Sequence, residues 1–417
     1  MNLLEPIIQF QQELKAIRRD IHAHPELSFE EVRTADVVAR QLEAWGIPVV
    51  RGLATTGVVG IVKGNRSGDG GAIGLRADMD ALPMQERNTF DHASRHEGRM
   101  HACGHDGHTA MLLGAARHLA AHRDFAGTVY LIFQPAEEGG GGARAMMDDG
   151  LFTRFPMEAV FGMHNWPGIP VGQFAVTPGP MMASSNEFEI TVNGKGAHAA
   201  LPHLGVDPIM VAVQIAQSLQ TIMTRNKKPI DAAVISITQI HSGSATNIVP
   251  NDAVLRGTVR TFSTEVLDMI ESRMRAIATH TAEAFGATVD MVFDRNYPAL
   301  INHPKETAFA ANVLAALVGP DKVNAECEPT MGAEDFAFML QEKPGCYVFI
   351  GNGEGDHREA GHGLGPCTLH NGSYDFNDDL LPLGATYWVN LVHQWFGTQA
   401  GTVAATADTA ETAEAGR

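Results

Sequence analysis

The chain has 417 residues, of which 44% are hydrophobic and 19% are charged, proportions that are typical of a soluble globular protein with two or three domains. The net charge of −18 argues against nucleic acid or an anionic membrane surface as the main partner. We expect a cytoplasmic protein without a membrane span, because the sequence contains no long apolar run and no secretory signal pattern, and its four cysteines lie far apart.

The first part of the chain predicts helices over 3–20 and 29–45 and a strand over 56–63. A second apolar strand begins at Ala72 and runs into two carboxylates, Asp78 and Asp80. In open α/β sheets, reacting groups lie just beyond the carboxyl ends of the strands. Two neighbouring acids repel each other, so we expect a cation close to them. An ordinary Asp-rich turn is the alternative.

The densest group of functional side chains is the segment 101–108, which reads HACGHDGH. It holds three imidazoles, a thiol and a carboxylate, and two glycines allow the backbone to bend between them. Imidazole and thiolate bind zinc, cobalt, nickel and similar ions. The alternative is a loop of capping residues in front of the helix predicted over 109–123.

Two further apolar strands also end in polar residues. The runs 128–133 and 159–165 are almost continuously apolar, as in parallel strands covered on both faces. The first is followed by Glu137, Glu138 and four glycines, and the second ends at His164. Neighbouring side chains diverge, so one glutamate could bind a metal while the other faces a substrate water. The alternative is an acidic surface loop.

A second unit follows a Gly-, Pro- and Met-rich hinge over 166–182. From 187 to 297 the pattern predicts the order strand, helix, strand, strand, helix, strand, which is the split, ferredoxin-like arrangement. His198 lies there in a Gly-rich turn, and Asn247 and Arg260 mark two other polar spots.

The chain is expected to return to the first domain near residue 298. Helices are predicted over 304–318 and 379–396, a strand over 346–351, and His370 lies between these elements. The Ala/Thr-rich segment 398–417 is of low complexity and predicts a disordered tail.

The polar groups at the ends of these elements suggest a catalytic metal site. Five candidate ligands of mixed N, S and O type are one more than a four-coordinate structural zinc needs. Their wide spread along the chain suits an open site with two metal ions, and Glu137 could then move protons beside them. The five candidates are Cys103, His105, Glu138, His164 and His370.

Over residues 15–396 the sequence resembles the M20-type metallopeptidases. Within them it is similar to the branch of aminoacylases, hippurate hydrolases and indole-acetyl-amino-acid hydrolases. The motifs that carry this resemblance are RADMDALP, HACGHDGH, QPAEEGGGGA, GMHNWP, GKGAHAALPH, NIVPNDA, GTVRTF, GAEDFA and LHNGSYDFND.

The resemblance implies a zinc-peptidase-like α/β catalytic domain, formed by 1–183 and 298–397. It also implies an inserted ferredoxin-like βαββαβ lid over 184–297, through which the chain would form a homodimer or homotetramer. Each subunit would bind two divalent ions, Mn, Zn, Co or Ni, through Cys103, His105, Glu138, His164 and His370.

The resemblance also implies roles for residues around the metals. Glu137 would be the general base, and Asp80 would orient a metal-bound histidine or water, with Asp78 as the second choice for that role. His198 would donate to the oxyanion across a domain or dimer interface.

By the same resemblance, Asn247 and Arg260 would hold the carboxylate of the substrate. The expected substrate is a small N-acyl amino acid, either N-acetyl or N-benzoyl, which is split into a carboxylate and a free amino acid.

Three alternatives remain open. The enzyme could act on small peptides or other N-acyl conjugates, as a carboxypeptidase does. It could be a thiol hydrolase with Cys103 as the nucleophile and His105 or His108 as the base. It could also be a metal-binding or sensor protein without activity, although the presence of Glu137 argues against that.

Overall fold

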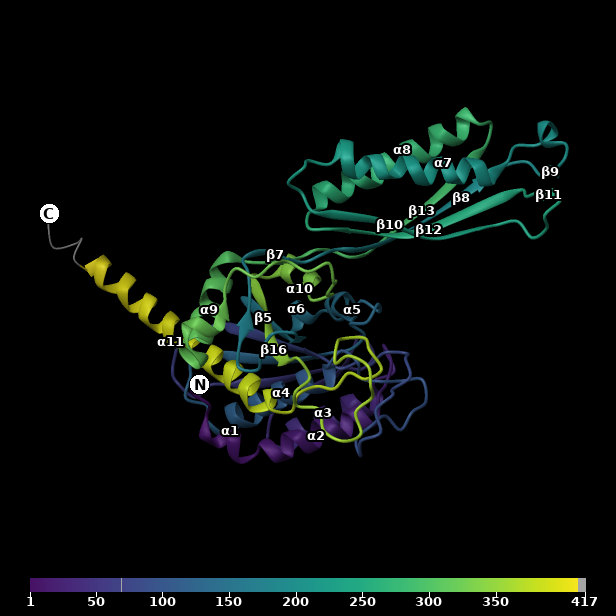
Figure 1. Ribbon diagram of the computed structural model, residues 1–417. Coiled ribbons are helices and arrows are strands. Elements are labelled where there is room, and N and C mark those ends of the chain that lie inside the picture. Colours follow the sequence, from purple (N-terminus) through teal and green to yellow (C-terminus); the bar gives the residue numbers. More distant parts are fainter. Residues whose placement is uncertain (69, 412–417) are drawn as a thin grey trace, which may run out of the picture. The chain divides into compact units, whose positions relative to one another are not determined.

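The computed structural model describes residues 1–68 and 70–411, with side chains up to residue 397, and it divides into two compact units (Figure 1). The first unit comprises Met1–Gly179, Asn302–Glu328 and the chain from Phe338 onward, and the second comprises Pro180–Ile301 and Pro329–Ala337. Each unit has its own hydrophobic core. The insert predicted over 184–297 falls within the second unit.

The first unit is built on a mixed eight-stranded sheet with the order β1-β2-β4-β3-β5-β16-β6-β15. Its central strands β4, β3, β5 and β16 are parallel, so their carboxyl ends meet at one edge of the sheet. The predicted α/β fold class is confirmed. The strands are β1 (Val49–Leu53), β2 (Gly57–Lys63), β3 (Ala72–Asp78), β4 (Thr128–Gln134), β5 (Ala159–Pro167), β6 (Phe174–Ala175), β15 (Val323–Asn324) and β16 (Gly345–Gly353).

Helix α4 is the central helix of the first unit. It packs on β3 and contacts α2, α3 and α11. At Gly114 an added Cβ would lie 2.7 Å from a Leu14 methyl carbon and 2.9 Å from the Ala385 Cβ, so glycine allows α2 and α11 to approach this closely. The helices are α1 (Glu5–Gln9), α2 (Gln11–Ala23), α3 (Val32–Ala44), α4 (His105–Ala121), α5 (Gly142–Asp148), α6 (Leu151–Arg154), α9 (Pro304–Val318), α10 (Ala337–Glu342) and α11 (Leu380–Glu411), with a 3-10 turn η3 (Pro320–Lys322).

Two helix boundaries differ from the sequence-based expectation. Helix α4 begins at His105 rather than near Thr109, because Gly104 adopts a left-handed conformation (φ 97°) and turns the chain directly into the helix. His105 and His108 therefore lie in the first helical turn. Helix α11 continues to Glu411, where the sequence predicted a disordered tail from 398, and residues 412–417 lie outside the described part.

The second unit is a four-stranded antiparallel sheet with the order β10-β12-β8-β13. Helices α7 and α8 pack on this sheet and on each other, which is the split βαββαβ arrangement. Its elements are β8 (Ser185–Asn193), β9 (Ala197–His198), η1 (Pro202–Leu204), α7 (Pro208–Thr221), the π-helical turn η2 (Ile222–Asn226), β10 (Ala233–Ser242), β11 (Ile248–Val249), β12 (Asp252–Thr261), α8 (Thr264–Ala284) and β13 (Thr288–Tyr297). The chain enters the unit through β7 (Gly179–Met182) and leaves it through β14 (Leu300–Asn302).

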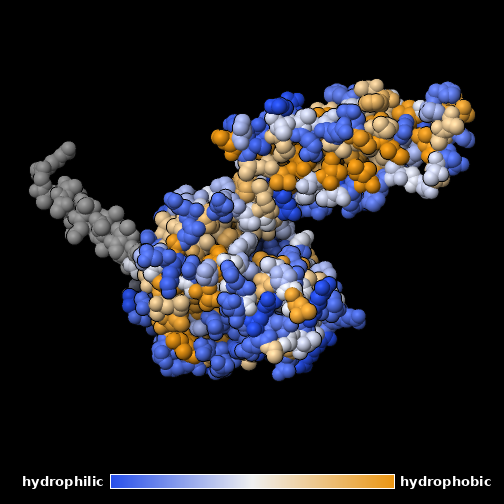
Figure 2. All heavy atoms as spheres, viewed as in Figure 1, coloured by the Kyte–Doolittle hydropathy of each residue, from blue (hydrophilic) through white to orange (hydrophobic). Residues whose placement is uncertain are grey.

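Helix α7 and the edge strand β10 of the second unit expose apolar side chains. Ile209, Met210 and Val213 of α7 are 39–57% exposed, and Ile240 of β10 is 50% exposed. Figure 2 shows apolar side chains gathered on the visible face of this unit. Among the described residues, no helix of either unit combines the length and apolarity that crossing a membrane requires.

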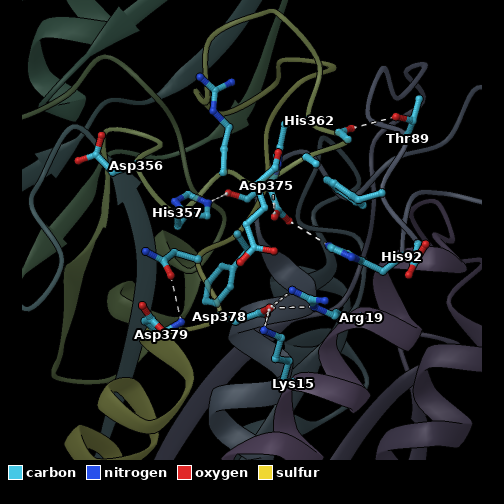
Figure 3. Close-up of a pocket in the computed structure, with 18 residues that line it drawn as sticks. Lys15, Arg19, Thr89, His92, Asp356, His357, His362, Asp375, Asp378 and Asp379 are labelled. Carbon is cyan, nitrogen blue, oxygen red and sulfur yellow. Dashed lines mark hydrogen bonds and ion pairs between the residues drawn. The ribbon is translucent and has the colours of Figure 1, made fainter.

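A buried ion cluster around Arg18 joins three segments of the first unit. Arg18 of α2 is fully buried, and its guanidinium lies 2.7 Å from Asp106 and 2.6 Å from Asp375. Burial raises the pKa of both carboxyls, but the Arg18 charge together with hydrogen bonds from neighbouring histidines holds each pKa well below its usual value. Asp375 also borders a polar pocket of about 620 Å³, where its side chain faces His92 and His362 (Figure 3).

We expect Arg18→Met to destabilise the first unit by about 3–5 kcal/mol, because it leaves Asp106 and Asp375 buried without the guanidinium that both contact. The loss of unfolding free energy should have its full size above the ordinary aspartate pKa of about 4. It should shrink as the pH falls further, since carboxyl groups with lowered pKa values stabilise the fold only while they are ionised. Urea unfolding at several pH values measures both effects.

Arg40→Met is the control, because Arg40 is 75% exposed in its pair with Asp36 and should contribute less than about 1 kcal/mol. Equal losses in the two variants would contradict the stabilising role of the Arg18 cluster.

Candidate metal centre

Several polar segments of the first unit lie together at the edge of the sheet where the parallel strands end. β3 ends at Asp78, the turn after the neighbouring β4 carries Glu137 and Glu138, and β5 on the other side of β3 carries His164. Helix α4 begins at the same place with His105. Residues that are far apart in the sequence therefore meet because their strands are neighbours.

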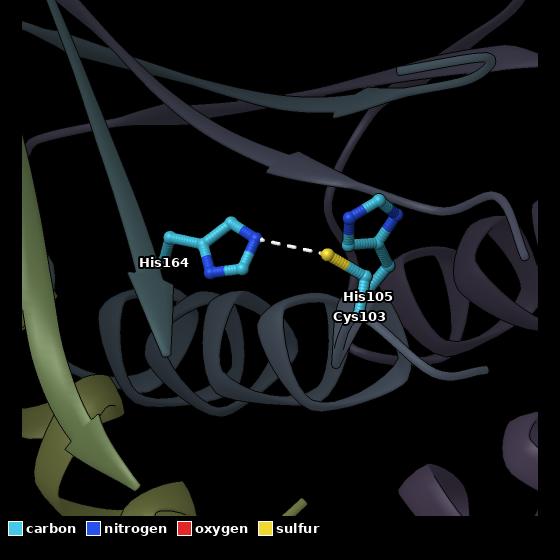
Figure 4. A group of neighbouring side chains, drawn as sticks. All are labelled: Cys103, His105 and His164. Carbon is cyan, nitrogen blue, oxygen red and sulfur yellow. Dashed lines mark hydrogen bonds between the residues drawn. The ribbon is translucent and has the colours of Figure 1, made fainter. Parts of the chain in front are cut away.

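The structure brings the five predicted ligands together in two groups that share Cys103. The ligand atoms of Cys103, His105 and His164 lie within 4.8 Å of one another. The Cys103 sulfur lies 3.3 Å from His164 Nε2 and faces it (Figure 4). Cys103 forms a second such group with Glu138 and His370. His370 Nε2 lies 3.2 Å from Glu138 Oε1. Two groups with one common sulfur suit a pair of neighbouring cations.

Hydrogen bonds on the outer side of the cluster orient two of its histidines. His105 Nδ1 lies 2.9 Å from the Asp80 carbonyl oxygen and 3.1 Å from Asp80 Oδ1, and His164 Nδ1 lies 2.6 Å from the Asn165 carbonyl oxygen. An N–H at each Nδ1 leaves Nε2 as the free ligand atom. The buried His105 Nε2 has no hydrogen-bond partner among the described residues, which fits a position reserved for a metal.

Asp80 also contacts Glu138, the second glutamate after β4. Its Oδ2 accepts the backbone N–H of Glu138 at 2.9 Å and the Ser28 hydroxyl at 3.1 Å. One carboxylate thus supports both His105 and Glu138. This contact geometry suits the orienting role that the sequence predicted for Asp80.

Asp78 lies 3.9 Å from His105 Nε2 and links the cluster to a further buried network. It accepts a hydrogen bond from Arg76 at 2.6 Å and lies 2.6 Å from His108 Nδ1. His108 Nε2 in turn lies 2.7 Å from Asn165 Oδ1, and the Asn165 amide donates to the Tyr374 hydroxyl at 2.6 Å. Of the two acids, Asp78 has the cation Arg76 beside it, and Asp80 has His105. The sequence analysis did not single out Arg76, although a charged residue inside an apolar strand was a usable signal.

The electrostatics of the cluster favour a bound cation. Burial lowers the pKa of His105, but Asp78 and Asp80 together raise it to about 10. Burial and the charges of Glu138 and Glu137 raise the pKa of the Cys103 thiol well above its usual value. A thiolate at this position therefore needs a cation beside it. A catalytic thiol needs a lowered pKa, so these surroundings do not favour the thiol-hydrolase alternative.

Glu137 lies beside the ligand groups without being one of the five predicted ligands. It is 6% exposed, and one of its carboxylate oxygens lies within 4.8 Å of ligand atoms of His105 and Glu138. A carboxylate in this position can reach a water molecule held at the cluster. Its role as general base stays a prediction.

The second unit carries the three other predicted site residues. His198 pairs with Ile248 across β9 and β11, and Asn247 accepts the N–H of Ala199 at 3.0 Å, so His198 and Asn247 lie at the same end of this unit. Arg260 lies eight residues beyond the first residue of β12, or about 26 Å away at about 3.3 Å per residue. The unit therefore does not bring Arg260 close to the other two, and all three roles stay predictions.

Comparison with known proteins relates the whole chain to one family. Residues 74–394 match the family described as Peptidase family M20/M25/M40. A hippurate hydrolase from Campylobacter jejuni is 40% identical over 391 residues, which cover 94% of this chain and 98% of that protein. Thermostable carboxypeptidase 2 from Saccharolobus solfataricus is 41% identical over 376 residues, which cover 88% and 92% of the two chains.

A solved structure has the same fold. The YXEP protein of Bacillus subtilis, described as a dinuclear metal binding peptidase of the M20 family, is 35% identical with a TM-score of 0.80. The similarity covers 94% of this chain and 99% of that one.

The shared position of Cys103 predicts how metal content responds to substitution. Cys103→Ala should lose most of both ions, because the thiolate belongs to both groups, whereas His164→Ala and His370→Ala should each keep about one ion per subunit. Elemental analysis of dialysed protein measures this.

His118→Gln is the control, because His118 is also a buried histidine of α4 but belongs to neither group, and it should keep two ions. Full metal content in Cys103→Ala would contradict the shared-ligand arrangement.

Proposed function

This chain belongs to peptidase family M20/M25/M40, and from that premise we propose that it cleaves N-acetyl or N-benzoyl amino acids with Glu137 as the general base. Its broader class follows from the relatives: it is a metal-dependent hydrolase of the amide bond in N-acyl amino acids. The observation that carries the finer proposal is the convergence of the five ligands beside Glu137.

The donor set fits two divalent cations. Cys103, His105 and His164 would hold one ion, and Cys103, Glu138 and His370 would hold the other. When bound, such ions lower the pKa of water and polarise the carbonyl group of the substrate. Thiolate, imidazole and carboxylate together accept Mn, Zn, Co or Ni.

The protein's own residues would then move the proton and fix the geometry. Glu137 would take a proton from the attacking water and deliver it to the leaving nitrogen, as one positioned carboxylate can do in both steps. Asp80 would keep His105 and Glu138 in place during the reaction. His198 would donate a hydrogen bond to the developing oxyanion.

The carboxylate of the substrate amino acid needs a cationic partner. Arg260 of β12 suits this role, because the guanidinium group binds both oxygens of a carboxylate, and Asn247 would add a polar contact. A peptide with a free carboxyl end presents the same group next to an amide bond. The similarity to thermostable carboxypeptidase 2 therefore supports small peptides as a second class of substrate.

The distribution of these residues supports a homodimer or homotetramer. Within one second unit, Arg260 lies about 26 Å from the end that carries His198 and Asn247, which is further than a small N-acyl amino acid extends. If all three residues contact one substrate, they come from two copies of the chain. The edge strand β10 and the exposed apolar residues of α7 offer a surface for such an assembly.

We expect Glu137→Gln to keep both metal ions and to lower kcat by about 10²-fold to 10⁴-fold, because the glutamine amide cannot accept the proton. The assay offers N-acetyl and N-benzoyl amino acids and dipeptides to protein loaded with Mn, Zn, Co or Ni. Wild-type turnover in this variant would disprove the role of Glu137. Wild-type protein with bound metal that cleaves no N-acyl amino acid would disprove the proposed substrate class.

We expect His198→Ala to keep both ions while kcat falls about 100-fold, which is typical of the loss of one oxyanion donor. If His198 serves the site of a second copy, mixing this variant with Glu137→Gln under subunit exchange should restore activity above that of either variant alone. Reduced metal content in His198→Ala would contradict the role of His198 as an oxyanion donor. No recovery of activity on mixing would contradict its action at the site of a second copy.

A further inference from the structure

One buried carboxyl group lies behind the turn that carries Glu137, and neither the family motifs nor the proposed mechanism uses it. Glu31, at the start of α3, is 0% exposed. Its Oε1 accepts the N–H of Phe29 at 3.0 Å and the N–H of Ala136 at 2.9 Å. Its Oε2 accepts the Thr56 hydroxyl at 2.6 Å. Three separate segments of the first unit are thus joined at one side chain.

Each of these three segments contains a non-glycine residue in the left-handed region. Phe29 has φ 65°, Thr55 next to Thr56 has φ 74°, and Ala136 has φ 54°. Residues with a Cβ adopt this conformation only uncommonly, and it persists where the surroundings force it. Here the hydrogen bonds to Glu31 supply that force at or next to each of the three residues.

Ala136 matters most because Glu137 and Glu138 follow it directly. The turn folds back on itself, since Ala136 O accepts the N–H of Gly142 at 3.0 Å and Glu137 O accepts the N–H of Gly139 at 2.8 Å. The backbone angle at Ala136 decides where the next side chain points. A change at Ala136 would therefore move the Glu137 carboxylate relative to the ligand groups.

We propose that Glu31 is a positioning residue that aims Glu137 at the reacting water by holding Ala136 in its left-handed conformation. This inference rests on the proposed role of Glu137 as the general base. Glu31 makes no hydrogen bond to a predicted metal ligand among the described residues, and its direct contact with the turn is the hydrogen bond from Ala136.

The proposal concerns the hydrogen-bond acceptor at Oε1 rather than the charge of Glu31. Burial raises the pKa of Glu31 to about 7, although the Thr56 hydrogen bond opposes this shift. In the neutral acid, Oε2 can donate to the Thr56 oxygen while Oε1 still accepts both backbone N–H groups. A glutamine can make the same three contacts, because its carbonyl oxygen takes the place of Oε1 and its amide group donates to Thr56.

The test compares Glu31→Leu with Glu31→Gln in the metal-loaded enzyme. Leucine removes the acceptor, and kcat should fall about 30-fold with KM within about twofold, since a displacement of about 1 Å in a catalytic group can cost up to about 100-fold. Glutamine should keep kcat within about threefold of wild type. The metal content should stay at two ions in both variants, and hydrogen exchange of residues 134–142 should become faster only in the leucine variant.

Glu26→Leu is the matched control. Glu26 lies in the same segment as Glu31, and its carboxylate accepts the N–H groups of Arg33 and Thr34 at 2.9 and 2.8 Å. Among the described residues, no hydrogen bond joins Glu26 to the turn after β4. Glu26→Leu should lower the thermal stability and leave kcat of the folded protein within about threefold, because the hydrogen bond from Ala136 to Glu31 stays in place.

Three results would overturn the inference. They are a wild-type kcat in Glu31→Leu, an equal loss of kcat in Glu31→Gln, or an equal loss in Glu26→Leu. If Glu31→Leu does not fold, Glu31→Ser replaces it, since water can enter beside the shorter side chain and satisfy the freed N–H groups, and the same fall in kcat is expected. Full activity in Glu137→Gln would instead refute the proposed general base, whatever the Glu31 variants show.

Discussion

The Asp80 carboxylate contacts two parts of the candidate metal centre at once, and the placement of two predicted ligands, His105 and Glu138, depends on it. Oδ1 faces His105 at the start of α4, and Oδ2 accepts the backbone N–H of Glu138 after β4. One rigid side chain thereby sets the spacing between a helix and a strand end. Outer partners of this kind fix the orientation of metal ligands and raise their basicity.

Buried negative charge is the second constraint on the first unit. Asp78, Asp80 and Asp106 are all buried, and an ionised carboxyl group remains buried only with a cation or strong hydrogen bonds beside it. Arg76 compensates Asp78, and Arg18 compensates Asp106. Around Cys103 the carboxylates raise the pKa of His105 against the effect of burial, and they add to burial in raising the pKa of Cys103. Two divalent ions would supply the missing positive charge.

The predicted site residues are distributed over both units. The first unit carries all five predicted ligands and the strand-end glutamates, whereas the second carries the residues proposed to bind the oxyanion and the carboxylate. In the second unit Arg260 lies near one end of the ten-residue strand β12, whereas His198 and Asn247 lie beyond its other end, around β9 and β11. If all three residues contact one small substrate, as we propose, this spacing requires two copies of the unit.

The sequence by itself determined the α/β class, the order of the main elements, and the chemical identity of the ligands. These features depend on local periodicity and on the residue types at strand ends. Both can be read from short stretches of the sequence. It did not predict that α4 begins at His105, because that boundary depends on the left-handed Gly104, whose added Cβ would lie 2.1 Å from Asn165 Oδ1.

Only the tertiary structure decided which distant groups meet. Arg18 pairs with Asp375, 357 positions away, and Glu31 accepts a hydrogen bond from Ala136, 105 positions away. No local pattern encodes such contacts, because they arise from the order of strands in the sheet, from the packing of α3 and α4 against it and from the packing of α2 on α4. Once that packing buries a carboxyl group, the cost of leaving it unpaired selects its partner.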